Sequence, residues 1–315
     1  NRGGPVPSVH SFAQSTMGWL FLMFMGVALF GSLIAFLWRM DNLVSRDKLE
    51  SLLSRESMFL FQNVLFLVAA FIIGARQLAL GIIVHEAGHQ SFFQHKSTNN
   101  FVASWLSGYW IFSSKNNYMK GHIKHHQLAG TADDPDLKNY HSYPVTRESF
   151  RRKIVRDLTG QTGWRRLKSI GRSIRHYRKL DHDSQNAVRG GLIVNLGLLG
   201  LFVSLNVTWL ILIWIGAFAT THMLCTRLRQ VAEHAAVPDL YSKDARLNTR
   251  TLKTHWWERL LIAPHQISFH MEHHLMPSVP LYRLPLLHRL LAAKGYYENI
   301  SFTQGYIPLF KQVTQ

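Results

Sequence analysis

The stretch GLIVNLGLLGLFVSLNVTWLILIWIGAFATTHML, residues 191–224, decides the fold. It contains no Lys, Arg, Asp or Glu. It is too long for one ordinary membrane helix, which needs about 20 residues. Asn206, Val207 and Thr208 interrupt it near the middle, which predicts two spans, 191–205 and 208–224, joined by a tight helical hairpin. We therefore expect an all-α, polytopic membrane protein.

Two further apolar stretches precede this block. Residues 16–38 carry no charge, and residues 58–84 carry only Arg76. Both stretches are long enough to cross a bilayer, so we expect four transmembrane helices in total. The apolar residues 101–112 are too few to cross, and they predict a re-entrant or interfacial segment.

The distribution of charge predicts the orientation. The chain has 35 Lys and Arg against 18 Asp and Glu, and residues 115–189 hold 17 of the basic residues but only 7 of the acidic ones. Because positively charged loops stay on the cytoplasmic side, this segment is expected there. With four spans, residues 115–189 and 226–315 would together form a cytosolic helical cap, and residues 1–315 would form one membrane domain.

The basic surface suggests several partners. Nucleic acid is not expected, because no recognised binding motif accompanies the charge. Anionic lipid headgroups and an acidic redox protein both remain candidates, and the two can coexist. The single cysteine, Cys225, excludes an internal disulfide, a Cys-rich zinc site and a self-contained iron–sulfur cluster.

Eight histidines lie in three short boxes beside the apolar segments. The boxes are His85-x-x-x-His89, His122-x-x-His125-His126 and His270-x-x-His273-His274. At these helical spacings the rings of one box share a face and can reach one metal. Neutral imidazole is a good ligand for iron, copper, nickel or zinc, and eight rings are too many for one ion. We therefore expect two metals, and the four-span topology places all three boxes on one side of the membrane.

A ninth candidate ligand follows the last span, in Arg229-Gln230-Val231-Ala232-Glu233-His234. His234 lies near the membrane exit, and Gln230, four residues earlier on the same helical face, could bind a metal directly or through water. Carboxylates that could accept an N–H from a ligating ring adjoin the boxes, namely Glu86, Asp134, Glu233 and Glu272. His265, five residues before the third box, is a further candidate.

Box one taken alone has a second interpretation. His85-Glu86-x-x-His89 also satisfies H-E-x-x-H, the signature of a zinc metalloprotease in which Glu86 would be the general base. A protease has no use for the other boxes, whereas two redox metals beside a bilayer favour oxidation of a lipid-like substrate. An intramembrane zinc metalloprotease and a non-enzymatic metal or lipid carrier stay open as alternatives. The sequence has no credible dinucleotide fingerprint, so the electrons are expected from a separate protein.

The three boxes in this order, together with Arg229-x-x-Ala232-Glu233-His234, resemble the membrane fatty acid desaturase superfamily, which also contains alkane and sterol-type hydroxylases and carotenoid ketolases. The likeness covers residues 58–290. Residues 248–251 (Asn-Thr-Arg-Thr) and residues 264–285 look most like acyl-lipid desaturases of the bacterial type.

The resemblance implies a non-haem di-iron site that uses O₂ as co-substrate. It implies nine histidine ligands, which are His85, His89, His122, His125, His126, His234, His270, His273 and His274. In some relatives an Asn four residues before the lone histidine holds a metal-bound water, but here that position is Gln230.

The implied reaction is formation of a carbon–carbon double bond in a lipid or fatty acyl chain. Hydroxylation or ketone formation on a lipid, alkane or carotenoid is the alternative on the same scaffold. The implied electron donor is an external ferredoxin, rubredoxin or cytochrome b5, and the implied location is a bacterial inner membrane rather than the endoplasmic reticulum.

Overall fold

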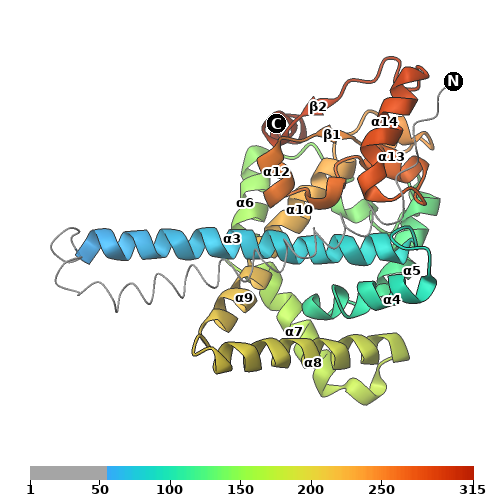
Figure 1. Cartoon of the computed structure of the whole chain (residues 1–315). Helices are drawn as coiled ribbons and strands as arrows, with labels where there is room; N and C mark the ends of the chain where they lie inside the picture. The colour runs from blue at the N-terminus through green and yellow to red at the C-terminus, as the bar shows by residue number, and fades with distance from the viewer. Residues whose placement is uncertain (1–54) are drawn as a thin grey trace, which may run out of the picture.

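The computed structural model describes residues 55–315, so the expected span at 16–38 lies outside the described residues. The described chain is almost entirely helical, as the sequence predicts (Figure 1). The α-helices are α3 (Arg55–Gly88), α4 (Lys96–Ser104), α5 (Lys115–Leu128), α6 (Arg147–Leu158), α7 (Gln161–Arg175), α8 (His182–Ser204), α9 (Leu210–Ala219), α10 (Thr221–His234), α11 (Ala245–Asn248), α12 (Trp256–Leu261), α13 (His270–Leu275), α14 (Leu284–Ala293) and α15 (Tyr306–Val313).

Short elements join these helices. They are the 3₁₀ helices η1 (Gly108–Ile111), η2 (Leu137–Asn139), η3 (Tyr177–Lys179), η4 (Pro264–Gln266) and η5 (Leu281–Arg283), and the strands β1 (Leu252–Lys253) and β2 (Thr303–Gln304). The two strands pair in parallel.

Three segments of the described chain are long and apolar enough to cross a membrane. They are Asn63–Gly88, His182–Ser204 and Leu210–His234. The third segment comprises α9 and α10, which meet at a break in the helical backbone at Thr220. Each helical segment extends beyond the apolar stretch that predicts it, because its polar end continues as helix. The protein is therefore an all-α membrane protein.

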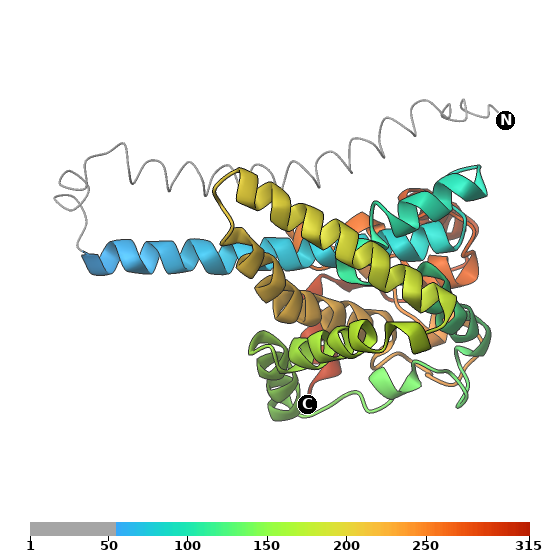
Figure 2. The ribbon, with the colours of Figure 1, turned by 90° about the horizontal axis from the view of Figure 1, so that it is seen from below.

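The hairpin between α8 and α9 turns where the sequence is least apolar. The carboxylate of Asp181 caps the start of α8 by accepting a hydrogen bond from the backbone N–H of Ser184 at 3.1 Å. The helix ends at Ser204, and Asn206 adopts a left-handed conformation with φ of 58°. Asn tolerates this conformation better than most residues, which suits it to the reversal (Figure 2).

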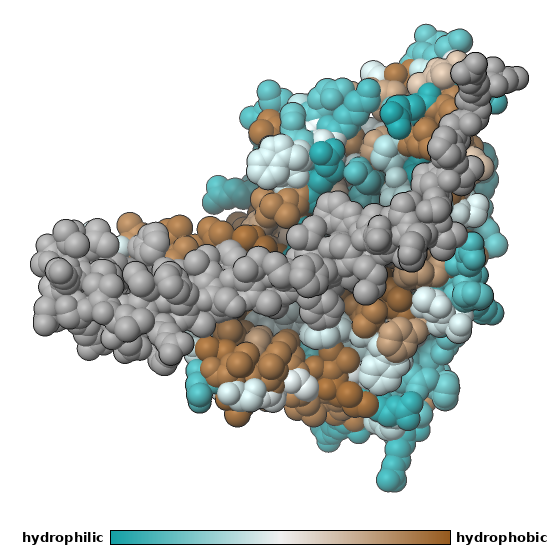
Figure 3. All heavy atoms as spheres, viewed as in Figure 1, coloured by the Kyte–Doolittle hydropathy of each residue, from teal (hydrophilic) through white to brown (hydrophobic). Residues whose placement is uncertain are grey.

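The outer faces of α8 and α9 are apolar. Ile193, Leu196 and Leu212 are each more than half exposed on these helices. On the face seen in Figure 3, hydrophobic residues gather over α8 and α9, and hydrophilic residues gather over the cap. Apolar side chains exposed over a contiguous surface mark a contact with lipid in a helix of this length.

A close crossing of α3 and α10 sets the position of the buried helices. A Cβ atom on Gly74 would lie 2.1 Å from Thr221 Oγ1 and 2.6 Å from the backbone nitrogen of His222. The Thr221 hydroxyl donates a hydrogen bond to the carbonyl of Ala70 at 2.6 Å. Small residues permit such an approach between membrane helices. The crossing brings the end of α10, with His234, near the end of α3.

The cap lies over α3 and α10. Its largest apolar core joins Ile82 of α3 and Leu228 of α10 to Leu252, Leu284 and Leu309 of the C-terminal elements. Residues 101–112 form the end of α4 and all of η1, and this segment packs against α8. In this arrangement of the cap, α5 and α13 lie at the C-terminal end of α3 (Figure 1).

Candidate metal centre

The three boxes and His234 meet in two groups of histidines. The first group contains His85, His89, His122, His126 and His273, and the second contains His125, His234, His270 and His274. Within each group, one ring nitrogen from every member lies within 4.8 Å of all the others. All nine histidines that the sequence singles out are thus brought together, and boxes two and three each contribute to both groups.

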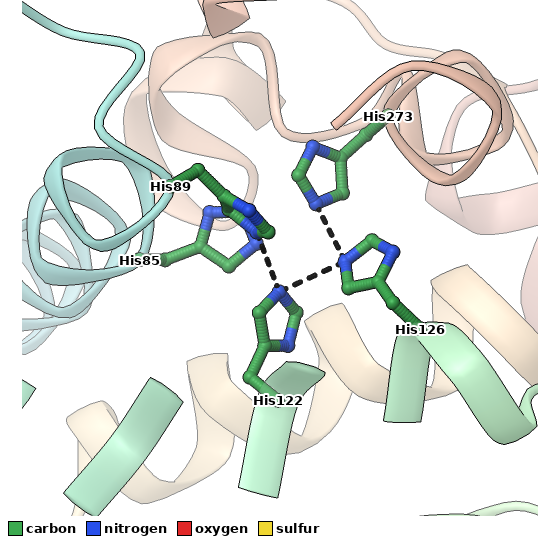
Figure 4. Close-up of side chains that lie close together, drawn as sticks. All are labelled: His85, His89, His122, His126 and His273. Carbon is green, nitrogen blue, oxygen red and sulfur yellow. Dashed lines mark hydrogen bonds between the residues drawn. The ribbon is translucent and has the colours of Figure 1, made fainter. Parts of the chain in front are cut away.

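The first group gathers rings from α3, α5 and α13 (Figure 4). His122 Nε2 lies 3.0 Å from His89 Nε2 and 3.0 Å from His126 Nε2. His126 Nε2 lies a further 3.0 Å from His273 Nε2. His85 presents its ring edge-on to His122, with ring centroids 4.4 Å apart.

The second group is built in the same way around His125. His125 Nε2 lies 3.2 Å from His234 Nε2 and 3.2 Å from His274 Nε2, and His234 Nε2 lies 2.9 Å from His270 Nε2. The rings of His126 and His274 stack with centroids 4.3 Å apart, so the two groups are adjacent.

These contacts fit two metal ions better than hydrogen bonds between rings. A ring nitrogen carries either one N–H or one lone pair, so His126 Nε2 cannot satisfy both of its neighbours. Both ring nitrogens of His85 are buried, and neither has a hydrogen-bond partner among the described residues. A buried polar atom without a partner is costly, and a metal ion would provide the partner. Imidazole nitrogen suits iron, zinc, copper and nickel.

The surroundings keep these rings neutral, as a metal ligand must be. Burial lowers the pKa of His89 to about 4. Burial, and then the neighbouring His89 and His125, lower the pKa of His126 to about 3. Burial and the facing rings of His126 and His273 lower the pKa of His122 well below its usual value. At neutral pH these rings therefore have free lone pairs.

Asp134 and a backbone carbonyl fix the orientation of two rings in the second group. Nδ1 of His125 lies 2.9 Å from Asp134 Oδ1, and Nδ1 of His234 lies 3.1 Å from the carbonyl oxygen of Asn248. In each case the proton belongs on Nδ1, which leaves the Nε2 lone pair directed into the group. The hydroxyl of Tyr140 also donates to Asp134. Burial acts to raise the pKa of Asp134, but the hydrogen bonds from His125 and Tyr140 outweigh it and lower the pKa.

Glu272 holds the third box through hydrogen bonds with residues outside both histidine groups. It accepts hydrogen bonds from Thr251 and Tyr297, and its Oε1 lies 2.6 Å from Nδ1 of His288. The carboxylate is fully buried. It therefore joins the start of α13 to α14 and to the chain that follows Asn248.

Glu86 has a similar structural role at box one. Its carboxylate accepts hydrogen bonds from the Ser91 hydroxyl and from the backbone N–H of Leu281 at 3.2 Å. The contact with Leu281 holds the end of α3 against η5, and the contact with Ser91 holds the segment that follows α3. The carboxylate is thus engaged with protein donors rather than placed as the base of a protease.

A buried ion pair adjoins the second group. Arg229 Nε donates to Glu233 Oε1 at 2.6 Å, and the same oxygen lies 3.6 Å from Nδ1 of His270. On the other side, the ring of Tyr118 stacks on His122 with centroids 5.4 Å apart. Arg229 and Glu233 therefore contact the second group and adjoin the ring that covers the first.

No described hydrogen bond joins two of the residues predicted for the site, Gln230 and His265, to the histidine rings. Gln230 is half-buried on α10, and none of the described hydrogen bonds joins it to a histidine. His265 lies in η4 in a left-handed conformation and belongs to neither group. Burial and the neighbouring Arg76 lower its pKa to about 4. Their roles at the metals stay predictions.

The sequence did not single out several residues that support the site. Tyr118 contacts the ligand candidate His122, Tyr140 donates to Asp134, and Tyr297 and His288 contact Glu272. Tyr140 follows Asp134 by six residues, which is a weak signal on its own. Asn248 and Thr251 belong to the segment that resembles acyl-lipid desaturases, and this likeness pointed to them without giving their roles.

Comparison with known proteins gives one family. The family model described as fatty acid desaturase matches residues 62–306, which include both histidine groups. The chain is similar to dihydrorhizobitoxine desaturase of Bradyrhizobium elkanii, with 27% identity over 258 residues covering 76% of this chain and 72% of the relative. It is also similar to beta-carotene ketolase of Paracoccus sp. (strain N81106 / MBIC 01143), with 28% identity over 228 residues covering 70% of this chain and 78% of the relative. The chain belongs to the fatty acid desaturase family and is a membrane oxidoreductase of that type.

Proposed function

We propose that the chain is an O₂-dependent di-iron desaturase that introduces a carbon–carbon double bond into a lipid or fatty acyl chain. The first histidine group would hold one iron ion and the second group would hold the other. The division of nine imidazoles into two adjacent groups carries this proposal, because each group offers four or five nitrogen ligands to one ion. Membership of the fatty acid desaturase family supports iron as the metal and a lipid as the substrate.

The protein's own contribution is to hold the rings and to keep water away. When bound, the iron pair would supply the oxidising power that an unactivated C–H bond requires. His85, His270 and His273 are at most 1% exposed, so their rings lie in a dry environment. Asp134 and Asn248 fix two rings in one tautomer before any metal binds. This arrangement lowers the cost of organising the site during the reaction.

The electrons would come from a separate acidic redox protein, which we take to be a ferredoxin, a rubredoxin or a cytochrome b5. Arg151, Arg152, Lys168 and Arg172 are exposed on α6 and α7 of the basic segment. Such a surface attracts an acidic partner and speeds its encounter. The positive charge of the same segment favours a cytosolic active site, and we propose the bacterial inner membrane as the location.

Hydroxylation or ketone formation is the second candidate. It is favoured by the similarity to beta-carotene ketolase, whose name describes ketone formation and which matches this chain with an identity and coverage similar to those of the desaturase. Nothing in the histidine geometry distinguishes these reactions, because the two groups define the metals and not the product. The zinc metalloprotease predicted from box one alone is disfavoured, since both of its histidines lie in a group completed by boxes two and three.

Mass spectrometry of host lipids tests the proposal. The gene would be expressed in a bacterial host, and lipids would be compared with those from cells carrying His273→Ala. Desaturation predicts products lighter by two hydrogens that require His273. Products that gain oxygen would contradict desaturation and support the second candidate.

A further inference from the structure

A pocket of about 320 Å³ lies between α5, η1, α7 and the start of α8. This volume is at the lower end of the range for sites that bind small molecules. The pocket is outside both histidine groups, because its lining contains none of the nine rings. One of its walls is Tyr118, whose ring stacks on His122 of the first group. A ligand in the pocket would therefore be separated from that group by a single aromatic ring.

Part of the pocket lining is polar and positively charged. Arg166, Ser169 and Ser173 lie on one face of α7, at helical spacings of three and four residues. Ser114, the N-cap of α5, and Asn117 of α5 also line the pocket. Guanidinium, hydroxyl and amide groups together can donate several hydrogen bonds to the oxygens of one anion.

Arg166 has no acidic partner within residues 55–315. Its Nη2 donates to the carbonyl oxygen of Phe112 at 3.3 Å, and the described chain gives it no carboxylate within ion-pair distance. None of the residues that line the pocket is acidic. The carboxylate of Asp181 accepts hydrogen bonds from the backbone and hydroxyl of the lining residue Ser184 and caps α8. Arg166 is accessible from the pocket, yet the surrounding protein lowers its pKa through desolvation. A charge in this position favours an anionic ligand.

Apolar side chains line the same pocket. They belong to Ala187 and Val188 of α8, Ile170 of α7 and Phe112. Ser184, near the capped start of α8, also lines the pocket, and the sequence of this helix becomes apolar beyond it. The pocket therefore combines polar with apolar lining beside the start of a membrane-spanning segment. Such a lining suits an amphiphile at a membrane surface.

We propose that this pocket binds the anionic end of the substrate, a carboxylate or phosphate group attached to an apolar chain, with Arg166 as its ionic partner. This inference rests on the proposed oxidation of an acyl substrate and adds the chemistry of its polar end. Anchoring the anionic end here would fix which carbon atoms of the substrate's apolar chain lie beside the metals. Arg166 and the serines would then determine which amphiphiles are oxidised.

Equilibrium binding of palmitate tests the pocket directly. The full chain, loaded with iron, would be placed in nanodiscs of phosphatidylcholine and titrated with radiolabelled palmitate. Methyl palmitate would serve as the uncharged competitor, and short-chain phosphatidylglycerol as the lipid-headgroup competitor. Wild type should bind palmitate at least tenfold more tightly than methyl palmitate, because a hydrogen-bonded charge contributes about a ten- to hundredfold gain in affinity.

Three variants separate the pocket from general effects of charge and folding. Arg166→Gln should weaken palmitate binding about tenfold or more, and Arg166→Lys should restore part of it. Ser173→Leu keeps the charge but fills the pocket, and it should also weaken binding. Arg289→Gln removes an exposed charge from α14, far along the chain, and should leave palmitate binding unchanged. All variants would be compared only where their melting temperatures match wild type.

Each further outcome decides one part of the inference. Equal affinity of wild type and Arg166→Gln for palmitate would overturn the pocket assignment. Displacement of palmitate by phosphatidylglycerol, with yields of oxidised lipid unchanged in Arg166→Gln, would identify a structural lipid site and overturn the substrate role. Arg166-dependent binding of palmitate by a protein that forms no oxidised product would support the pocket and contradict the proposed function.

Discussion

Replacing Asp134 with asparagine isolates what the carboxylate behind His125 contributes. In the structure, Asp134 Oδ1 and Oδ2 lie 2.9 Å and 3.1 Å from Nδ1 of His125, and the carboxylate also accepts from Tyr140. Asparagine keeps the shape of the side chain but presents an N–H₂ group to one of these two donors. Either the proton on His125 or the hydroxyl of Tyr140 then loses its acceptor.

The expected loss of metal affinity follows from the position of the Asp134 carboxylate behind a ligating histidine. Removing the partner of a ligating histidine costs about ten- to hundredfold in metal affinity, or about 1.4–2.7 kcal/mol. The loss should be confined to the second group, because Asp134 hydrogen-bonds to none of the rings of the first group. Asp133→Asn is the matched control, since this neighbouring carboxylate is exposed.

The assay is chelator competition on the iron-loaded full chain. Wild type and Asp133→Asn should release two irons over the same range of chelator concentration. Asp134→Asn should release one iron at about ten- to hundredfold lower chelator and retain the other as in wild type. Identical release by all three proteins, or an equal shift of both irons, would refute a role of Asp134 in orienting His125.

Three further changes test other parts of the account. Gly74→Ala should lower the melting temperature and the iron content, because its Cβ would overlap Thr221, and such overpacking costs about 1–3 kcal/mol; Gly200→Ala, which has open space around it, should do neither. Glu272→Gln should lower iron content in both groups, since the buried carboxylate accepts three contacts that position box three. Burial and Arg76 lower the pKa of His265 to about 4 from its ordinary value of 6.5. The contribution of the neutral ring to folding stability is therefore full above pH 6.5 and is lost as the pH falls towards 4. His265→Asn should therefore lose less melting temperature than wild type between pH 7 and pH 5, and an equal loss would contradict this assignment.

The sequence predicted the fold class and the gathering of the nine histidines for a physical reason. Apolar length predicts membrane helices, and charge bias predicts that the box-bearing segments lie on one side, where the rings are free to meet. Helical spacing could not show that His125 and His126 belong to different groups. That division depends on how α5 packs against the end of α3, where a Cβ atom on Gly88 would lie 2.3 Å from Sδ of Met119 in α5, so it is set by tertiary packing.

The residues around the ligands were harder to predict than the ligands. Asp134 could be predicted because it follows box two closely in the chain. Tyr118 meets Arg229, which is more than 100 residues later in the chain, and His288 meets Glu272 through the fold of the C-terminal cap. No sequence motif predicts the pocket beside Arg166, because its lining comes from four separate segments of the chain.

The most direct test of the account is the number and location of the irons. The full chain would be loaded anaerobically with ⁵⁷Fe and analysed for metal content and by Mössbauer spectroscopy, alongside His85→Ala and His274→Ala. The account predicts two irons per chain with nitrogen-rich ligation, and a weakened site in a different histidine group in each variant. One metal per chain, preferential retention of zinc, or the same spectral change in both variants would contradict it.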